Sequence, residues 1–144
     1  MNDWQQRFSR KMETLREQSV RRYQEKMEEV VVPAFERLTE FLTQWHFVAS
    51  VPQSHPGLHS YKFALTEDGY VLIGFRLTGI DQMDCAYECC LPGQGHIGGD
   101  NLRSALTDID ASWADTCFQT ALDDFVEKFG TVRHSREYAE PVLA

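Results

Sequence analysis

A stripe of apolar side chains with helical spacing runs through the first third of the chain. Its members recur every three or four residues, as on one face of an α-helix; they are Val20, Tyr23, Met27, Val30, Ala34, Leu38, Phe41 and Trp45. A weaker upstream extension comprises Trp4, Phe8, Met12 and Leu15. A helix over residues 3–45 would be about 65 Å long, whereas a compact body of this chain length is about 38 Å across. The helix therefore either folds back or is covered by a second chain.

Pro33 interrupts this stripe. Proline removes one backbone hydrogen bond and disfavours a helical conformation in the residue before it. A true break would reset the apolar spacing, but the gaps stay at three or four residues from Met27 to Leu38. Val32 would also be a poor N-cap for a new helix. We therefore expect one continuous helix that is kinked at Pro33, with residues 1–31 as a protruding or dimerising arm.

Alternating apolar residues predict an antiparallel hairpin in the middle of the chain. The alternating residues are Tyr61, Phe63 and Leu65, then Val71, Ile73, Phe75 and Leu77. A two-residue turn at Asp68-Gly69 would place Phe63 and Ile73 on opposite faces. A three-residue loop with Gly69 in the left-handed region would pair Thr66 with Tyr70 and place the whole set on one face. Because a one-residue slip would expose this set, burial favours the three-residue loop.

Three further segments complete the expected fold. Residues 47–51 and 83–91 read as strands, and the second has Cys85 and Cys89 on one face and Cys90 on the other. Residues 92–100 are glycine-rich and predict a loop, while residues 102–109 fit either a short strand or a helical turn. A last helix, capped by Asp110 or Ser112 and ended by Gly130, has the apolar stripe Trp113, Cys117, Phe118, Ala121, Leu122, Phe125 and Phe129.

These segments predict a single α+β domain over residues 1–144. A long, kinked N-terminal helix leads into an antiparallel meander of about four strands, and a C-terminal helix packs on one face of the sheet. The length of 144 residues is sufficient for one hydrophobic core.

Charge and composition exclude several classes of function. The net charge is −8, and all of it lies after residue 46, because residues 1–46 carry eight basic and eight acidic residues. This acidity argues against nucleic acid as a partner. The chain has no run of eighteen apolar residues and no apolar signal core, so we expect neither membrane association nor secretion. Its four cysteines are then expected to be free thiols in the cytoplasm.

No motif predicts catalysis, a cofactor or a metal. Residues 93–98 match the letters of a dinucleotide-binding fingerprint, but two consecutive glycines would have to continue its helix. Cys85 and Cys89 would lie about 13 Å apart along a strand, which is too far to share a zinc ion. One alternative remains: His55, His59 and His96, with Asp100, would form the mouth of a ligand-binding or enzymatic pocket if the fold brings them together.

The sequence therefore favours a non-catalytic cytoplasmic interaction module, chaperone- or adaptor-like and homodimeric, that binds itself and a protein client. The expected dimer or partner interface comprises Trp4, Phe8, Met12, Leu15, Val20, Tyr23 and Met27. A small-ligand binder or enzyme with a pocket at the histidine loops is the alternative function.

Overall fold

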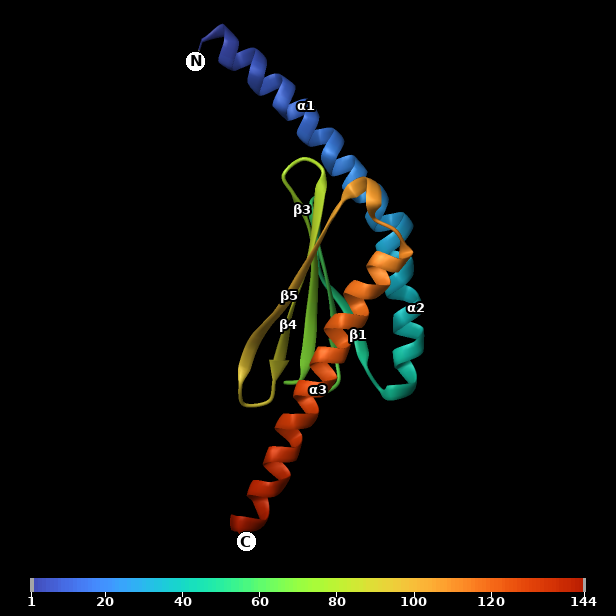
Figure 1. The fold of residues 1–144 in the computed structure, drawn as a ribbon, viewed down its shortest axis with the longest axis vertical. Helices are drawn as coiled ribbons and strands as arrows, with labels where there is room; N and C mark the ends of the chain where they lie inside the picture. Colours follow the sequence, from blue (N-terminus) through green and yellow to red (C-terminus); the bar gives the residue numbers. More distant parts are fainter. Residues whose placement is uncertain (1, 144) are drawn as a thin grey trace.

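The computed structural model describes the backbone of residues 2–143 and the side chains of residues 2–132. The elements follow one another as helix, five strands and helix (Figure 1). They are α1 (Asp3–Lys26), a π-helical segment (Met27–Val31), α2 (Val32–Leu42), a 3₁₀ turn (Thr43–Trp45), β1 (Val48–His55), β2 (Leu58–Ala64), β3 (Tyr70–Thr78), β4 (Gln82–Leu91), β5 (Gly95–Ala105), a second 3₁₀ turn (Leu106–Asp108) and α3 (Ala111–Leu143). The predicted α+β class is confirmed, with five strands in place of about four.

The N-terminal helix is continuous through Pro33, as predicted. The N–H of Val32 donates to the carbonyl of Met27, five residues earlier, so one wide turn directly precedes the proline. Proline supplies no N–H to a regular helix, and π-bulges and prolines are the usual positions at which helices bend. The helix accordingly changes direction between α1 and α2 without ending (Figure 1).

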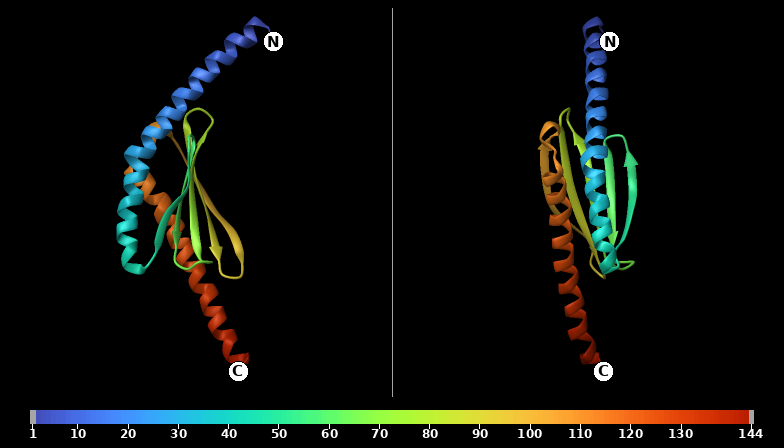
Figure 2. Two further views of the ribbon diagram at one scale, coloured as in Figure 1. Left: turned by 180° about the vertical axis from the view of Figure 1, so that it is seen from behind. Right: turned by 90° about the vertical axis from the view of Figure 1, so that its right-hand side faces the viewer.

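The five strands form one antiparallel meander in the order β1-β2-β3-β4-β5. Both helical segments lie against the same face of this sheet, and the other face carries no covering element among the described residues (Figure 2). The covered face supplies the sheet side of the core, which comprises Tyr61, Phe63, Val71, Ile73, Phe75, Met83, Cys85, Tyr87, Cys89 and Leu91. Phe118 and Phe125 of α3 pack onto it and are also buried.

The β2–β3 hairpin has the predicted faces but not the predicted turn. Tyr70 pairs with Ala64 instead of Thr66, and this shift by two residues keeps Phe63 and Val71 on the covered face. Gly69 is not in the left-handed region, so that part of the prediction is wrong. The glycine is needed for space instead, because a Cβ there would lie 2.6 Å from Cε2 of Phe129.

The glycine-rich segment and the end of α3 also depart from expectation. Residues 95–105 form strand β5, although the sequence predicts a loop over residues 92–100. Strand β5 pairs with β4, and the sequence pattern of this segment does not reveal that pairing. The ambiguous residues 102–109 divide between this strand and a 3₁₀ turn. Helix α3 begins with Asp110 accepting the N–H of Trp113 at 2.9 Å, as predicted, but it continues through Gly130 to Leu143.

Candidate functional site

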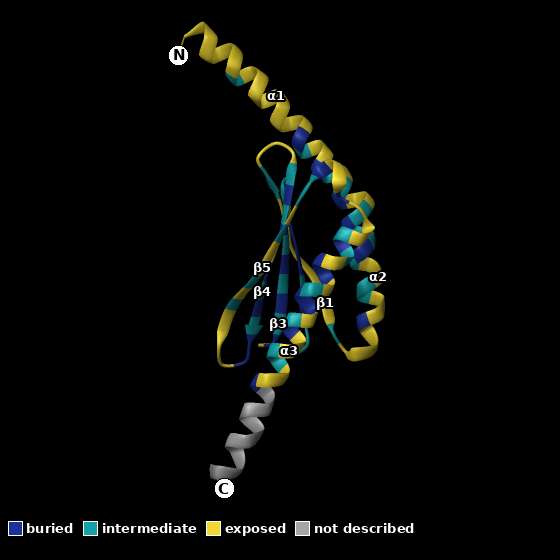
Figure 3. Cartoon of the chain, viewed as in Figure 1, coloured by how far each residue is buried: buried dark blue, intermediate teal, exposed yellow. Residues whose placement is uncertain are grey.

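The first four turns of α1, residues 3–18, stand clear of the sheet and are called the arm (Figure 3). A capping box starts the helix: Asn2 accepts the N–H of Gln5 at 2.8 Å, and the Gln5 side chain accepts the N–H of Asn2. The arm carries the predicted apolar residues Trp4, Phe8, Met12 and Leu15, all exposed. Trp4 and Phe8 stack with ring centroids 5.1 Å apart. An exposed aromatic pair on an ordered helix is typical of an interaction surface.

The predicted interface extends too far along the helix. Tyr23 and Met27 have no exposed surface, because they pack against the protein's own sheet, and Val20 is half-buried. The prediction that a second chain covers Tyr23 and Met27 is therefore wrong. Burial by the sheet raises the pKa of Tyr23, whose hydroxyl donates to the carbonyl of Phe75. The part of the predicted interface that a partner can reach therefore ends at Val20.

A groove of about 640 Å³ lies between the arm and the tips of two hairpins, and we call it the arm groove. Its walls are the arm, the β1–β2 turn and the β3–β4 turn; the lining residues are Met12, Glu13, Arg16, Val20, Pro56, Gly57, Leu58, Arg76, Leu77, Gly79 and Ile80. Its apolar side chains include Met12, Val20, Leu58, Leu77 and Ile80. Its polar groups are two arginines and one glutamate, so the groove is apolar with a basic rim.

Hydrogen bonds join the two hairpin walls of the arm groove to each other and to α1 beyond the arm. The N–H of Leu77 donates to the carbonyl of Gly57 at 2.8 Å, which joins the two hairpins. His59 lies between Gln24 of α1 and Ser54 of β1, with ring nitrogens 3.2 and 3.3 Å from their side-chain oxygens. The third wall, the arm, continues from this anchored part of α1.

The four residues of the alternative histidine site do not meet. His59 is buried against α1, while His55 is exposed at the end of edge strand β1. His96 and Asp100 belong to β5, the opposite edge of the sheet, and His96 pairs with Glu88 at 2.8 Å. Among the described residues, no three His, Cys, Asp or Glu side chains converge in a way that could hold a metal ion.

Ser54 and His59 form the closest approach to a nucleophile–base pair. In a hydrolytic triad, a carboxylate orients the histidine and stabilises its charged form. Here the second ring nitrogen faces the amide of Gln24. Burial and the nearby His55 lower the pKa of His59, against a smaller opposing effect of Glu28. These contacts describe a neutral histidine that ties α1 to a hairpin.

The cysteines lie as predicted. Cys85 and Cys89 face the core, whereas Cys90 is on the uncovered face of the sheet and half-buried. A hydrogen bond to Cys117 and burial raise the pKa of Cys85, and burial raises the pKa of Cys89. Buried thiols with raised pKa values are poor nucleophiles.

A polar cluster joins α3 to the sheet at the β5 edge. Tyr87 donates to Asp124 at 2.9 Å, and Lys128 donates to the same carboxylate oxygen at 2.8 Å. Burial and the bond to Asp124 raise the pKa of Tyr87 to about 12. Each polar group in this cluster has a partner, so the cluster serves to position α3.

Sequence reasoning identified the arm but not the opposite wall of the groove. Leu58, Leu77 and Ile80 come from two hairpins that are distant in sequence from the arm. The available signal was the position of these apolar residues next to Gly57 and Gly79, where turn residues are ordinarily polar.

Comparison with known proteins adds no relative. No family model, no curated protein and no solved structure matches this chain. Within the part of the chain that the structure describes, none of the helices combines the length and the apolar character needed to cross a bilayer.

Proposed function

We propose that this protein is a non-catalytic interaction module, chaperone- or adaptor-like, that binds a segment of a client protein in the arm groove. The observation that carries this proposal is the groove itself. An ordered helix projects past the sheet and forms, with two hairpin tips, an apolar hollow of about 640 Å³. Helices and extended segments of partner proteins commonly dock into grooves of this kind.

The charges of the groove define the chemistry of the client segment. Arg16 and Arg76 contribute two positive charges and Glu13 one negative charge to the lining. A segment with apolar anchors and flanking carboxylates would complement this rim, whereas a basic segment would be repelled. The acidity of the remaining chain argues against nucleic acid and anionic lipid as alternatives.

The cytoplasm is the compartment that we propose for this activity. All four cysteines are free thiols, and three of them are buried. Free thiols are typical of proteins in reducing compartments.

Photo-crosslinking in the native cell tests the proposed function. A photoreactive residue replaces Ile80, on the rim of the arm groove, or Glu67, which is exposed in the β2–β3 turn. We expect adducts with another protein from position 80 and not from position 67. The charge reversals Arg16→Glu and Arg76→Glu should reduce the adducts several-fold. Equal yields from both positions, or yields unaffected by charge reversal, would show that the groove does not hold an acidic client segment.

A further inference from the structure

A second apolar groove lies between α2 and α3, on the outer side of the helical layer. It has a volume of about 320 Å³, and its floor includes Leu38, Phe41 and Phe118. We call it the helix groove. Phe41 is 58% exposed. Trp45, in the 3₁₀ turn after α2, and Val126 of α3 are similarly exposed, at 61% and 51%. The two helices lie on the same face of the sheet and diverge toward the C-terminal end of α3 (Figure 2).

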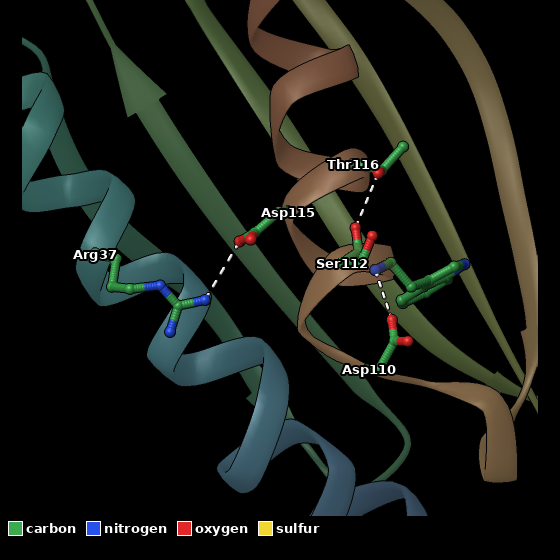
Figure 4. Close-up of polar contacts among 6 residues, drawn as sticks. Arg37, Asp110, Ser112, Asp115 and Thr116 are labelled. Carbon is green, nitrogen blue, oxygen red and sulfur yellow. Dashed lines mark hydrogen bonds and ion pairs between the residues drawn. The ribbon is translucent and has the colours of Figure 1, made fainter.

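Acidic residues border the helix groove. Asp115 of α3 reaches across to Arg37 of α2 at 3.3 Å, and this ion pair bridges the groove (Figure 4). Glu40 precedes Phe41, and Asp123 lies one turn of α3 beyond the lining residue Gln119; both are exposed. The wider surface is also acidic, because residues 23–144 carry eight basic and nineteen acidic residues.

The arm lacks this acidic excess. Residues 3–18 carry four basic and three acidic residues. At 3.6 residues per turn, Arg7 and Lys11 lie along one edge of the apolar stripe, Arg16 and Glu13 lie toward the other edge, and Glu17 lies on the far side of the helix. One edge of the stripe is therefore basic and the other carries both charges. Trp4, Phe8 and Leu15 do not line the arm groove, so the proposed client leaves them without a role.

The arm is long enough to cover the helix groove. Trp4 and Leu15 are eleven residues apart, which is about 16 Å at 1.5 Å per residue, and the groove-lining residues of α2, from Ala34 to Phe41, span about 10 Å. The arm cannot reach the helix groove of its own chain, because the arm and α2 belong to one continuous helix that runs away from the groove (Figure 1). Every other copy of the chain, however, carries the same arm.

We propose that the arm of one copy docks in the helix groove of a second copy, and that the two copies exchange arms reciprocally. Trp4, Phe8, Met12 and Leu15 then cover Leu38, Phe41 and Phe118, and the basic edge of the arm, Arg7 and Lys11, lies beside Glu40 and Asp123. Each contact occurs twice in such a two-fold dimer. This inference goes beyond the proposed function, since it uses a different partner and, apart from Met12, different apolar residues of the arm.

Light scattering on the full-length protein between 1 and about 100 μM tests the inference. We expect a mass of twice the 16.6 kDa of the chain at the upper concentrations. Phe8→Asp in the arm and Phe41→Asp in the groove should each weaken the dimer at least tenfold. Both side chains are exposed, so circular dichroism should show unchanged folding. A wild-type mass of one chain throughout, or a dimer that survives Phe41→Asp, overturns the inference.

A charge exchange between copies gives a sharper test. One variant carries Arg7→Glu and Lys11→Glu, so that its arm and its groove are both acidic. The other carries Glu40→Lys and Asp123→Lys, so that both are basic. Each variant alone should be monomeric, and an equimolar mixture should form a heterodimer, because both arm–groove contacts become complementary. A mixture that stays monomeric while the wild type is dimeric would place the dimer interface elsewhere. Neither result bears on the client in the arm groove, which the crosslinking experiment tests separately.

Discussion

The hydroxyl of Tyr23 donates a 2.6 Å hydrogen bond to the main-chain carbonyl of Phe75, and neither residue has any exposed surface. This bond joins α1 to the central strand of the sheet at the point where the helix leaves the body. The helix is anchored on one side of Tyr23 and free on the other. The arm thus projects from a fixed base, which allows it to act as a docking surface without disturbing the core.

Loss of the Tyr23 hydroxyl should destabilise the fold. Tyr23→Phe removes the donor and leaves a buried carbonyl without that partner, so we expect the free energy of unfolding to fall by about 1–3 kcal/mol. Tyr70→Phe, on the uncovered face of the sheet, is the matched control and should change it by less than about 0.5 kcal/mol. Urea unfolding measures both. Equal effects would mean that the buried hydrogen bond adds no stability.

Acidification should lower the free energy of unfolding through His59, which ties α1 to a hairpin. Burial, with a contribution from His55, lowers the pKa of His59 below its usual 6.5 in the folded state. The unfolded chain therefore binds a proton more readily than the folded one. This contribution to stability is complete above pH 6.5 and is lost as the pH falls through the folded pKa. We expect the free energy of unfolding to decline between pH 7.5 and 5. His59→Gln should flatten this decline, and an unchanged pH profile would contradict the assignment.

Two adjacent glycines of β5 should differ sharply in how well they tolerate substitution by alanine. A Cβ at Gly99 would overlap the ring of Tyr87, whereas a Cβ at Gly98 would meet nothing within 4 Å. Gly99→Ala should therefore lower the free energy of unfolding by about 1–3 kcal/mol through overpacking. Gly98→Ala should lower it much less. Thermal unfolding of both variants checks this difference, and similar melting temperatures would mean that β5 does not approach Tyr87 as described.

One thiol should react before the other three. Cys90 is half-buried on the uncovered face, while Cys85, Cys89 and Cys117 lie in the core. A thiol reagent added to the native protein should label Cys90 first, and Cys90→Ser should remove the fast phase. Mass spectrometry of the labelled peptides identifies the site. A fast phase that survives Cys90→Ser would contradict the strand orientation.

Local periodicity was sufficient to predict much of the fold. The spacing around Pro33 predicted a bent continuous helix, and the alternation around Phe63 and Ile73 predicted the correct buried face. These features depend on residues a few positions apart. The turn at Gly69 was predicted wrongly because its glycine makes room for Phe129, a contact between segments sixty residues apart in the sequence.

The candidate site was less predictable than the fold. The exposed stripe of the arm could be read from its helical spacing, but periodicity cannot tell which part of one stripe the sheet will cover. Tyr23 and Phe8 belong to the same helical stripe, but Tyr23 is buried and Phe8 is exposed. Strand β5 was missed for a related reason, because Gly98 and Gly99 have low strand propensity. Pairing with β4 on both sides of a register shift, Gly98 with Glu88 and Asn101 with Ala86, holds this segment in the sheet.

Peptide selection on the immobilised protein tests directly whether the arm groove binds an acidic, apolar segment. A library of random peptides is selected against the wild type and, in parallel, against the variant with Arg16→Glu and Arg76→Glu. We predict that the wild type enriches peptides in which apolar residues are flanked by aspartate or glutamate, and that the variant loses this acidic preference. Selection of basic peptides by the wild type, or the same acidic peptides by both proteins, would contradict the claim that the arm groove binds an acidic, apolar client segment.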